Sequence, residues 1–510
     1  MLAKIHSATV EGVNGLLVEV EVDIAFGLPY FATVGLPEAA VRESKDRVKA
    51  AIKNSGYEFP AHRITVNLAP ADLRKAGTAF DLPIAVGIVA ASGLVPEFKL
   101  NRYLLIGELS LDGRVRPVPG VLPIVIAAKR AGLLGVMVPV ENAREAAVVQ
   151  GIDVIAVEHL HQAIEFFAGI VEIEPKHVDL ESFFQGAQRF EADLCEVKGQ
   201  EHAKRALEIA AAGGHNLMFE GPPGSGKTMM ARRLPSIMPD LTLDEALETT
   251  GIYSVAGLLG KEDGIVMQRP FRAPHHSISD AGLIGGGQIP RPGEVSLAHN
   301  GVLFLDELAE FKKNILEGLR QPLEDGSVTI SRAASSISFP ADFILVAASN
   351  PCPCGFLGDT NHQCSCSATQ IQRYRSRISG PLLDRIDMYV EVAAVSFKDL
   401  SAQDDAESSA EVKARVIRAR ALQRQRFADT PNVYNNSQMP PKHVKRFCIL
   451  DQTSEQLLEK AVVRLGLSAR AFRRIQKIAR TIADLAGSEN IQISHIAEAI
   501  QYRRLDRKSS

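Results

Sequence analysis

The segment at residues 221–228 reads Gly-Pro-Pro-Gly-Ser-Gly-Lys-Thr, a glycine-rich loop that ends in lysine and threonine. A largely apolar run, residues 216–220, precedes the loop, and helical spacing begins at Lys227. A strand, a glycine-rich loop and a helix in this order surround bound phosphate with backbone N–H groups. We therefore expect a nucleotide-binding α/β domain. Its predicted binding residues are Gly221, Pro222, Pro223, Gly224, Ser225, Gly226, Lys227 and Thr228.

Two acidic residues further along the chain fit the same chemistry. Residues 302–305 form an apolar run that ends in Asp306 and Glu307. Lys227 is expected to reach the β- and γ-phosphates, Thr228 and Asp306 to hold Mg²⁺, and Glu307 to polarise the attacking water. Two acids after a strand can simply cap the next helix. Their occurrence about 80 residues after a phosphate loop favours the catalytic interpretation.

Three further polar residues are candidates for the same site. Asn350 ends the apolar run 344–349, where an amide can orient water, although Asn before proline is also a turn former. Arg385 lies in a predicted loop between a helix and a strand, and Arg470 opens a predicted helix. Arginine stabilises charge on a transferring phosphoryl group. From spacing alone, an ordinary salt-bridge role for each arginine stays open.

The chain of 510 residues is long enough for about two to four domains. Residues 1–172 have mixed strand and helix patterns, and residues 173–192 are a polar stretch that we interpret as a linker. In residues 193–395 apolar strands alternate with helices, which predicts a parallel, doubly wound sheet. Residues 396–510 are helical and basic. We predict helices over 411–427, 454–465, 469–486 and 494–504.

Composition narrows the class of protein. A net charge of −3, with 46% hydrophobic and 23% charged residues, is that of an ordinary globular protein and argues against a general nucleic-acid coat. No apolar stretch is long enough to span a membrane, and the first ten residues lack the pattern of a secretory signal. A cytoplasmic protein with no membrane partner is therefore expected.

Four of the six cysteines form one cluster with the spacing C-x-C-x9-C-x-C. Four thiolates can close a tetrahedral structural zinc site, although each pair is one residue tighter than the usual C-x2-C. Free thiols and a redox function remain open, and His362 could replace one ligand. The candidate Zn²⁺ ligands are Cys352, Cys354, Cys364 and Cys366.

Several long motifs resemble those of the magnesium-chelatase-like AAA+ proteins, most closely the ComM/YifB family, which is associated with natural transformation. They are FRAPHH at 271–276, GGG at 285–287, RPGEVSLAH at 291–299 and NPCPCG at 350–355. The resemblance implies an AAA+ P-loop core with a helical lid that uses ATP and Mg²⁺. It also implies a homo-hexameric ring in which Arg385 reaches a neighbour's ATP and Arg470 acts as a lid sensor.

The same resemblance implies that residues 327–343 form a β-hairpin, and two strand-like runs joined at 333–336 agree with this. In related ring helicases such hairpins point into the pore. Arg332, near the tip, is therefore the candidate DNA contact, acting on phosphates rather than bases. A solvated turn arginine is the alternative. For His275 and His276, in a second inserted segment (about 254–293), a structural role is favoured over metal binding, since adjacent side chains seldom share one face.

The N-terminal region resembles the proteolytic domain of Lon proteases through KAGTAFDLP at 75–83 and GELSLDGRV at 107–115. Ala79 stands where Lon has its nucleophilic serine, and residues 120–124 supply no lysine. Without a nucleophile and its base, serine–lysine hydrolysis is not possible. We expect an α+β fold of the Lon proteolytic (S5-like) type, catalytically inactive and retained for assembly or DNA binding.

These expectations combine into a ring-shaped, ATP-driven DNA motor that moves branched recombination intermediates, binds DNA without sequence preference and works with recombination proteins. The alternatives are an ATPase subunit of a magnesium-chelatase-type complex and a protein unfoldase. Basic C-terminal helices could line such a ring or could simply be solvated. The arginine-rich stretches are 413–426, 464–480 and 502–508.

Overall fold

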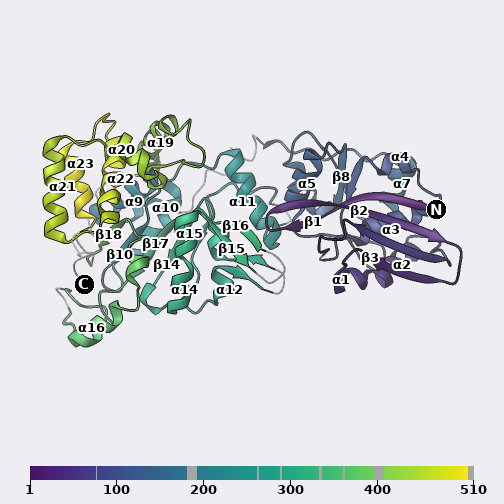
Figure 1. Ribbon diagram of the computed structural model, residues 1–510, viewed down its shortest axis with the longest axis horizontal. Helices are drawn as coiled ribbons and strands as arrows, with labels where there is room; N and C mark the ends of the chain where they lie inside the picture. The colour runs from purple at the N-terminus through teal and green to yellow at the C-terminus, as the bar shows by residue number, and fades with distance from the viewer. Residues whose placement is uncertain are drawn as a thin grey trace. The chain divides into compact units, whose positions relative to one another are not determined.

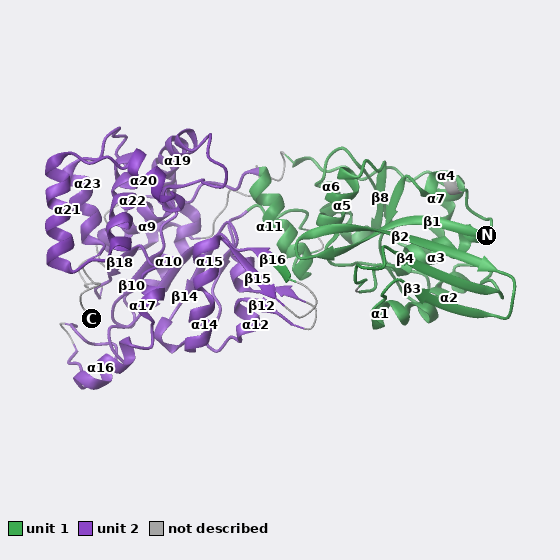
Figure 2. Ribbon diagram, viewed as in Figure 1, with its two compact units in different colours: residues 1–186, 243–267, 333–338 green, residues 187–242, 268–332, 339–510 purple. Residues whose placement is uncertain are grey.

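The computed structural model describes residues 1–75, 77–180, 192–260, 263–287, 290–331, 336–359, 362–394 and 406–503. It divides into two compact units (Figure 2). Unit 1 comprises residues 1–186, 243–267 and 333–338, and unit 2 comprises residues 187–242, 268–332 and 339–510. Most of the expected linker, residues 181–191, lies outside the described residues. The units are therefore discontinuous in sequence, unlike the continuous ranges expected above.

Unit 1 is built on a seven-stranded mixed sheet with strand order β3-β4-β2-β1-β5-β8-β9 (Figure 1). β1, β2 and β4 pair antiparallel, whereas β5, β8 and β9 continue the sheet in parallel. The strands are β1 (Leu2–Glu11), β2 (Asn14–Ala25), β3 (Tyr30–Val34), β4 (Arg63–Ala69), β5 (Tyr103–Leu105), β8 (Gly135–Pro139) and β9 (Asp153–Val157). Strand-like patterns at residues 13–24, 63–68 and 103–107 predict β2, β4 and β5, whereas β1, β3, β8 and β9 were not predicted.

Helix α3 (Asp81–Ala91) lies at the centre of this unit, and every one of its residues is buried. A helix that is apolar on all sides is stable only inside a core. An ion pair between Arg47 and Asp81 closes its N-terminal end. The other elements of the unit are α1 (Ala39–Arg42), α2 (Ser44–Asn54), α4 (Glu97–Leu100), β6 (Glu108–Leu109), β7 (Val115–Arg116), α5 (Val121–Arg130), η1 (Val140–Asn142), α6 (Ala143–Ala147) and α7 (Leu160–Ala168).

Helix α11 (Leu243–Ala256) follows the phosphate loop in the sequence but belongs to unit 1. It packs against α5, where the N–H of Gly120 donates to the carbonyl of Ser254 at 3.0 Å. Leu247 contacts the apolar cluster of the sheet face that α5 covers. The inserted segment that we expected over about 254–293 is therefore split, with residues up to 267 in unit 1 and the rest in unit 2.

Unit 2 contains the predicted parallel sheet, with strand order β11-β14-β17-β10-β18. All four strand pairings are parallel. The strands are β10 (Leu217–Glu220), β11 (Phe271–Arg272), β14 (Val302–Leu305), β17 (Ile344–Ser349) and β18 (Met388–Glu391). β10, β14 and β17 agree with the predicted apolar runs, and they lie side by side at the centre of the sheet.

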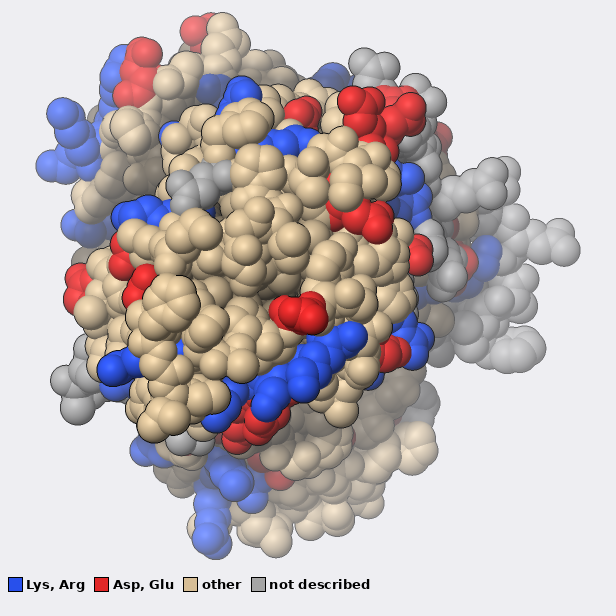
Figure 3. Space-filling model, turned by 90° about the vertical axis from the view of Figure 1, so that its right-hand side faces the viewer, with Lys and Arg blue, Asp and Glu red and all other residues tan. Residues whose placement is uncertain are grey.

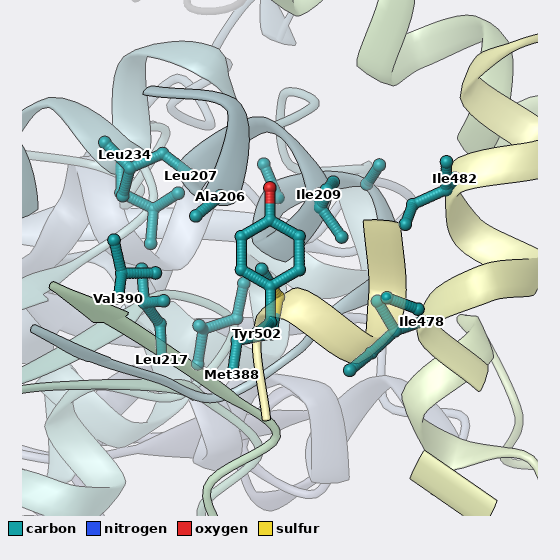
Figure 4. Packing of buried hydrophobic residues seen from close by; sticks show 14 of the residues in the cluster. Ala206, Leu207, Ile209, Leu217, Leu234, Met388, Val390, Ile478, Ile482 and Tyr502 are labelled. Atoms are coloured by element: carbon teal, nitrogen blue, oxygen red, sulfur yellow. The ribbon is translucent and has the colours of Figure 1, made fainter. Parts of the chain in front are cut away.

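The core of unit 2 joins this sheet to helices from both ends of the unit. Tyr502 points into a cluster with side chains from α9 (Glu201–Gly213), β10 and β18, as Figure 4 shows. Ile478 and Ile482 of α22 (Ala469–Leu485) complete the same cluster. The C-terminal helices therefore pack directly on the sheet that carries the phosphate loop.

The predicted C-terminal helices are observed within a few residues of their expected limits. They are α19 (Ser409–Arg426), α21 (Gln452–Leu465), α22 and α23 (Ile493–Gln501), and α20 (Pro441–Phe447) is an additional short helix. The remaining elements are η2 (Leu194–Glu196), α10 (Lys227–Ile237), α12 (Asp280–Leu283), β12 (Gly285–Gly286), β13 (Arg291–Pro292), α13 (Glu294–Leu297), η3 (Leu308–Glu310), α14 (Lys313–Gly318), α15 (Arg320–Asp325), β15 (Ser327–Ser331), β16 (Ser336–Pro340), α16 (Ala368–Arg375), α17 (Gly380–Leu383) and η4 (Asn436–Gln438). Among the described residues, none of these helices has the length and apolar character needed to cross a membrane.

Candidate functional site

The phosphate loop connects the end of β10 to the start of α10. Gly224 and Gly226 have φ angles of +77° and +90°, a region that favours glycine, and a Cβ added to either would meet no atom within 4 Å. The loop therefore presents open backbone. The hydroxyl of Ser225 is buried at 1% exposure and has no hydrogen-bond partner in the described part of the chain. Accessible backbone N–H groups and the unpaired hydroxyl of Ser225 can bind a phosphate group.

Lys227 is held at the centre of this loop. Its Nζ donates to the carbonyls of Gly221 at 2.7 Å and Pro222 at 2.8 Å, and to Oδ1 of Asn350 at 3.3 Å. Burial lowers the pKa of its ammonium group, while the carboxylates of Asp306 and Glu307 act in the opposite direction. Within the described residues, no carboxylate lies within ion-pair distance of Nζ. An ammonium group held by neutral oxygens remains available to an anionic ligand.

Asp306 and Thr228 come together where β14 and the loop end. The hydroxyl of Thr228 donates to Oδ2 of Asp306 at 2.7 Å, and Oδ1 of Asp306 accepts from the N–H of Glu307 at 2.9 Å. A hydroxyl and a carboxylate are hard oxygen ligands of the kind that Mg²⁺ prefers. The structure thus pairs Thr228 with Asp306, and the adjacent Lys227 with Asn350, at the phosphate loop. Their catalytic roles stay predictions.

Glu307 has a histidine partner that the sequence did not indicate. Its backbone has φ 52° and ψ 47°, and Nδ1 of His276 lies 3.5 Å from its carboxylate. The neighbouring ring of His275 is 4.0 Å away between centroids and bonds to Ser277. The FRAPHH motif drew attention to this histidine, but nothing in the motif predicted which acid it contacts. His276 therefore contacts the proposed water-polarising residue, and the pair belongs to no cluster of metal ligands found among the described residues.

Arg385 and Arg470 lie together, away from the contacts of the phosphate loop. The guanidinium of Arg385, 6% exposed, donates to the carbonyl of Pro381 at 2.6 Å and to the carboxylate of Glu324. Arg470 is 63% exposed and lies 3.9 Å from Asp384. No partner of either arginine in the described part of the chain belongs to the phosphate loop. Their roles as finger and sensor stay predictions.

The four cysteines of the cluster converge. Their Sγ atoms all lie within 4.8 Å of one another. Hydrogen bonds from the backbone of Phe356 and of Ser365 lower the pKa of Cys354 to about 6, which favours the thiolate. His362, the alternative ligand, instead lies 3.7 Å from Asp359 and packs on Phe356. The expectation that His362 could replace a cysteine is therefore not supported by its position.

The predicted hairpin and the basic C-terminal residues are the regions where DNA contacts were expected. β15 and β16 form a two-stranded sheet, as expected, but Arg332 lies outside the described residues. On the face of the molecule seen in Figure 3, positive and negative side chains of the described residues are interspersed. Many C-terminal basic residues have internal partners: Lys413 with Asp240, Arg415 with Glu208 and Glu407, Arg426 and Arg480 with Asp484, and Arg474 with Asp387. These basic residues therefore support the fold.

Ala79, where a Lon-type nucleophile was sought, is surrounded by polar groups that are satisfied internally. The hydroxyl of Thr78 donates to Glu108, and the carbonyl of Ala79 accepts from the N–H of Gly107 at 3.0 Å. Lys75 is completely buried, and its Nζ donates to the carbonyl of Pro70. Position 79 carries no hydroxyl, and the loss of peptidase chemistry stays a prediction.

Comparison with known proteins matches almost the whole chain. The family model "Magnesium chelatase, subunit ChlI" matches residues 193–400, "Subunit ChlI of Mg-chelatase" residues 20–142, and "Magnesium chelatase, subunit ChlI C-terminal" residues 406–503. Competence protein ComM of Haemophilus influenzae is 46% identical over 99% of this chain and 98% of its own length. YifB of Salmonella typhimurium is 45% identical over the same shares. Lon protease 2 of Bacillus subtilis is 26% identical over 34% of this chain and 35% of its own length, a partial similarity at the N-terminal region.

Proposed function

The chain belongs to the ComM/YifB family of magnesium-chelatase-like AAA+ proteins, and from this membership we propose that it is an ATP-driven DNA motor acting on recombination intermediates. The observation that carries the proposal is the pairing of Lys227 with Asn350 and of Thr228 with Asp306 at the phosphate loop. The name of the Haemophilus relative, a competence protein, supports a task in natural transformation where the host is competent. The expected cellular location is the cytoplasm.

Each residue of the site has a distinct task in this proposal. The open backbone at Gly224 and Gly226 and the ammonium group of Lys227 bind the phosphates. Thr228 and Asp306 hold Mg²⁺, which neutralises charge on the phosphate oxygens. Glu307 accepts the proton of the attacking water. Asn350 orients that water from the end of β17.

The completion of the site by a second subunit is part of the proposal. Arg385 contacts Glu324 and Pro381 rather than the phosphate loop of its own chain. A homo-hexameric ring would place it near a neighbour's nucleotide, with Arg470 as the lid sensor. Mixing Arg385→Ala chains with Glu307→Gln chains tests this, because subunits with complementary defects restore hydrolysis at some interfaces. Mixtures with no more activity than the two variants alone would contradict a trans role.

The decisive experiment measures ATP hydrolysis by the purified chain with and without a synthetic four-way junction, together with strand exchange on that junction. We expect DNA to stimulate hydrolysis and the junction to move only with ATP. Glu307→Gln is the matched control, which should bind ATP without moving the junction. Absence of both stimulation and movement would reject the DNA motor.

A remodelling ATPase of the magnesium-chelatase type is the second candidate, because all three matched family models bear the name of that subunit. It predicts hydrolysis that branched DNA does not change. A protein unfoldase predicts the same insensitivity together with ATP-dependent loss of structure in a tagged substrate. The junction assay therefore separates the DNA motor from both alternatives.

A further inference from the structure

The four cysteines near the end of β17 have the spacing of a metal site rather than of disulfides. Sγ of Cys352 lies 3.4 Å from that of Cys354 and 3.7 Å from that of Cys364, and the Cys354–Cys364 separation is 3.6 Å. A disulfide requires about 2.05 Å between sulfurs. Four thiolates about 2.3 Å from a tetrahedral Zn²⁺ ion stand about 3.8 Å apart. The observed separations are close to the second value.

The surroundings of the sulfurs are those of a supported ligand set. Cys352 is completely buried, and the N–H of Cys354 donates to Sγ of Cys366 at 3.4 Å. Backbone donors that orient ligand sulfurs are a regular feature around protein metal sites. Directly after Cys366, Ser367 caps α16 through the N–H of Gln370 at 3.3 Å. Both pairs of ligands are therefore attached to ordered backbone.

One turn of the cluster lies directly on the phosphate loop. Gly355 has φ +85°, and a Cβ added to it would stand only 2.6 Å from Cδ of Pro223. Two residues before Cys352, Asn350 accepts from Nζ of Lys227. From α16, Arg375 reaches Glu220, the residue before the phosphate loop, at 3.4 Å. Both ends of the cluster therefore contact the nucleotide site.

We propose that Cys352, Cys354, Cys364 and Cys366 bind one Zn²⁺ ion, and that this ion holds the turn at Gly355 against Pro223 so that the phosphate loop keeps its nucleotide-binding shape. The role is positioning, because four sulfurs leave no open coordination position for substrate. The coupling to ATP rests on the proposed ATPase function, whereas the metal site stands independently of it. Loss of the ion frees the turn and weakens nucleotide binding.

The first test counts metal in the full-length chain purified under reducing conditions. Elemental analysis should find one zinc per chain, and exchange with Co²⁺ should give the intense absorption of cobalt–thiolate bonds. Cys364→Ser should lose most of the metal, while Cys195→Ser, outside the cluster, should retain it. A chain that takes up neither zinc nor cobalt overturns the site. Disulfides that form among these cysteines after gentle removal of reductant, with no release of metal, also overturn it.

The second test measures binding of a fluorescent ATP analogue before and after removal of zinc by a chelator. Removal should weaken binding about 5–10-fold, a typical coupling between two sites, and added Zn²⁺ should restore it. Gly355→Ala should weaken binding in the zinc-loaded chain. Gly358→Ala is its matched control, since Gly358 has φ +83° but no atom within 4 Å of an added Cβ.

The outcomes distinguish this inference from the proposed function. Unchanged affinity after zinc removal, or equal effects of Gly355→Ala and Gly358→Ala, would overturn the coupling even if zinc is bound. A zinc-loaded chain that binds ATP with the expected coupling but ignores branched DNA would reject the DNA motor and leave the inference intact.

Discussion

Unit 1 and unit 2 each hold a basic side chain that is at least partly buried, but its charge is treated differently in the two units. In unit 1, Arg47 makes two hydrogen bonds to the carboxylate of Asp81, at 2.8 and 3.1 Å. In unit 2, Nζ of Lys227 is held by carbonyls and an amide. The charge of Arg47 is neutralised inside the chain and stabilises the fold, whereas the charge of Lys227, held by neutral groups, is available to an anionic ligand. Arg47 therefore stabilises unit 1, and Lys227 offers its charge to the ligand proposed for unit 2.

The largest effect is expected at Lys227. Lys227→Ala removes the cation that the proposed site offers to the phosphates and should lower ATP turnover by about 100-fold or more. Steady-state hydrolysis measures this, and circular dichroism checks that the fold is intact. Lys413→Ala, which removes a lysine paired with Asp240, is the control and should retain activity. Full turnover in the Lys227 variant would mean that the phosphate loop has been misassigned.

Arg47→Met leaves Asp81 buried without its partner and should destabilise unit 1. We expect a loss of about 2–3 kcal/mol, below the cost of breaking a fully buried pair because Arg47 is 23% exposed. Chemical denaturation measures this loss. The double variant Arg47→Met, Asp81→Asn should recover part of it. ATP turnover per folded chain should not change, and a strong fall in turnover would contradict the assignment of this pair to the fold.

Asp387 extends the comparison within unit 2, because this buried acid serves the fold at the start of β10, at the opposite end of that strand from the phosphate loop. Against the cost of burial, Arg474 and His215 keep the pKa of Asp387 well below its ordinary range. Its contribution to stability is therefore present above the unfolded value of about 3.9 and is lost as pH falls through the folded pKa. Asp387→Asn should lower the melting temperature by about 2–4 °C at pH 7. The difference from the parent chain should shrink in acid, and a constant difference would contradict this account.

The smallest effect is expected at His276. Because its ring contacts the carboxylate of Glu307, His276→Asn should change kcat by about 3–10-fold with little effect on ATP binding. His275→Asn, whose ring bonds to Ser277 instead, is the matched control. Equal effects of both substitutions would remove the distinction between the two histidines.

The sequence predicted the parts of unit 2 whose signals are local. The phosphate loop, the acids at Asp306 and the apolar strands each carry their own pattern, and a parallel sheet brings its strand ends together. The contact of His276 with Glu307 could not be predicted, because the two are separated in sequence and depend on the left-handed backbone at Glu307. The placement of Arg385 against Glu324 likewise depends on how α15 and α17 pack, which spacing does not specify.

In unit 1 the sequence predicted only some of the strands and helices, and it did not predict that α11 belongs to this unit. Its residues follow the phosphate loop in sequence. The helix also has no marked apolar face from which its packing partner could be predicted. Only the packing of α11 on α5 assigns it to unit 1. Long-range packing of this kind carries no local signature.

That packing has a consequence for how the protein is made. A ribosome extends a chain from its N-terminus, and domains usually begin to fold as they emerge. The face of α5 that contacts α11 through Leu247 and Ser254 stays uncovered until residues 243–267 have been synthesised. By then the phosphate loop has already been made. Although unit 1 begins at the N-terminus, it can therefore be completed only after the nucleotide-binding segment has been synthesised. A fragment truncated at residue 172 would be left with an uncovered apolar face on α5.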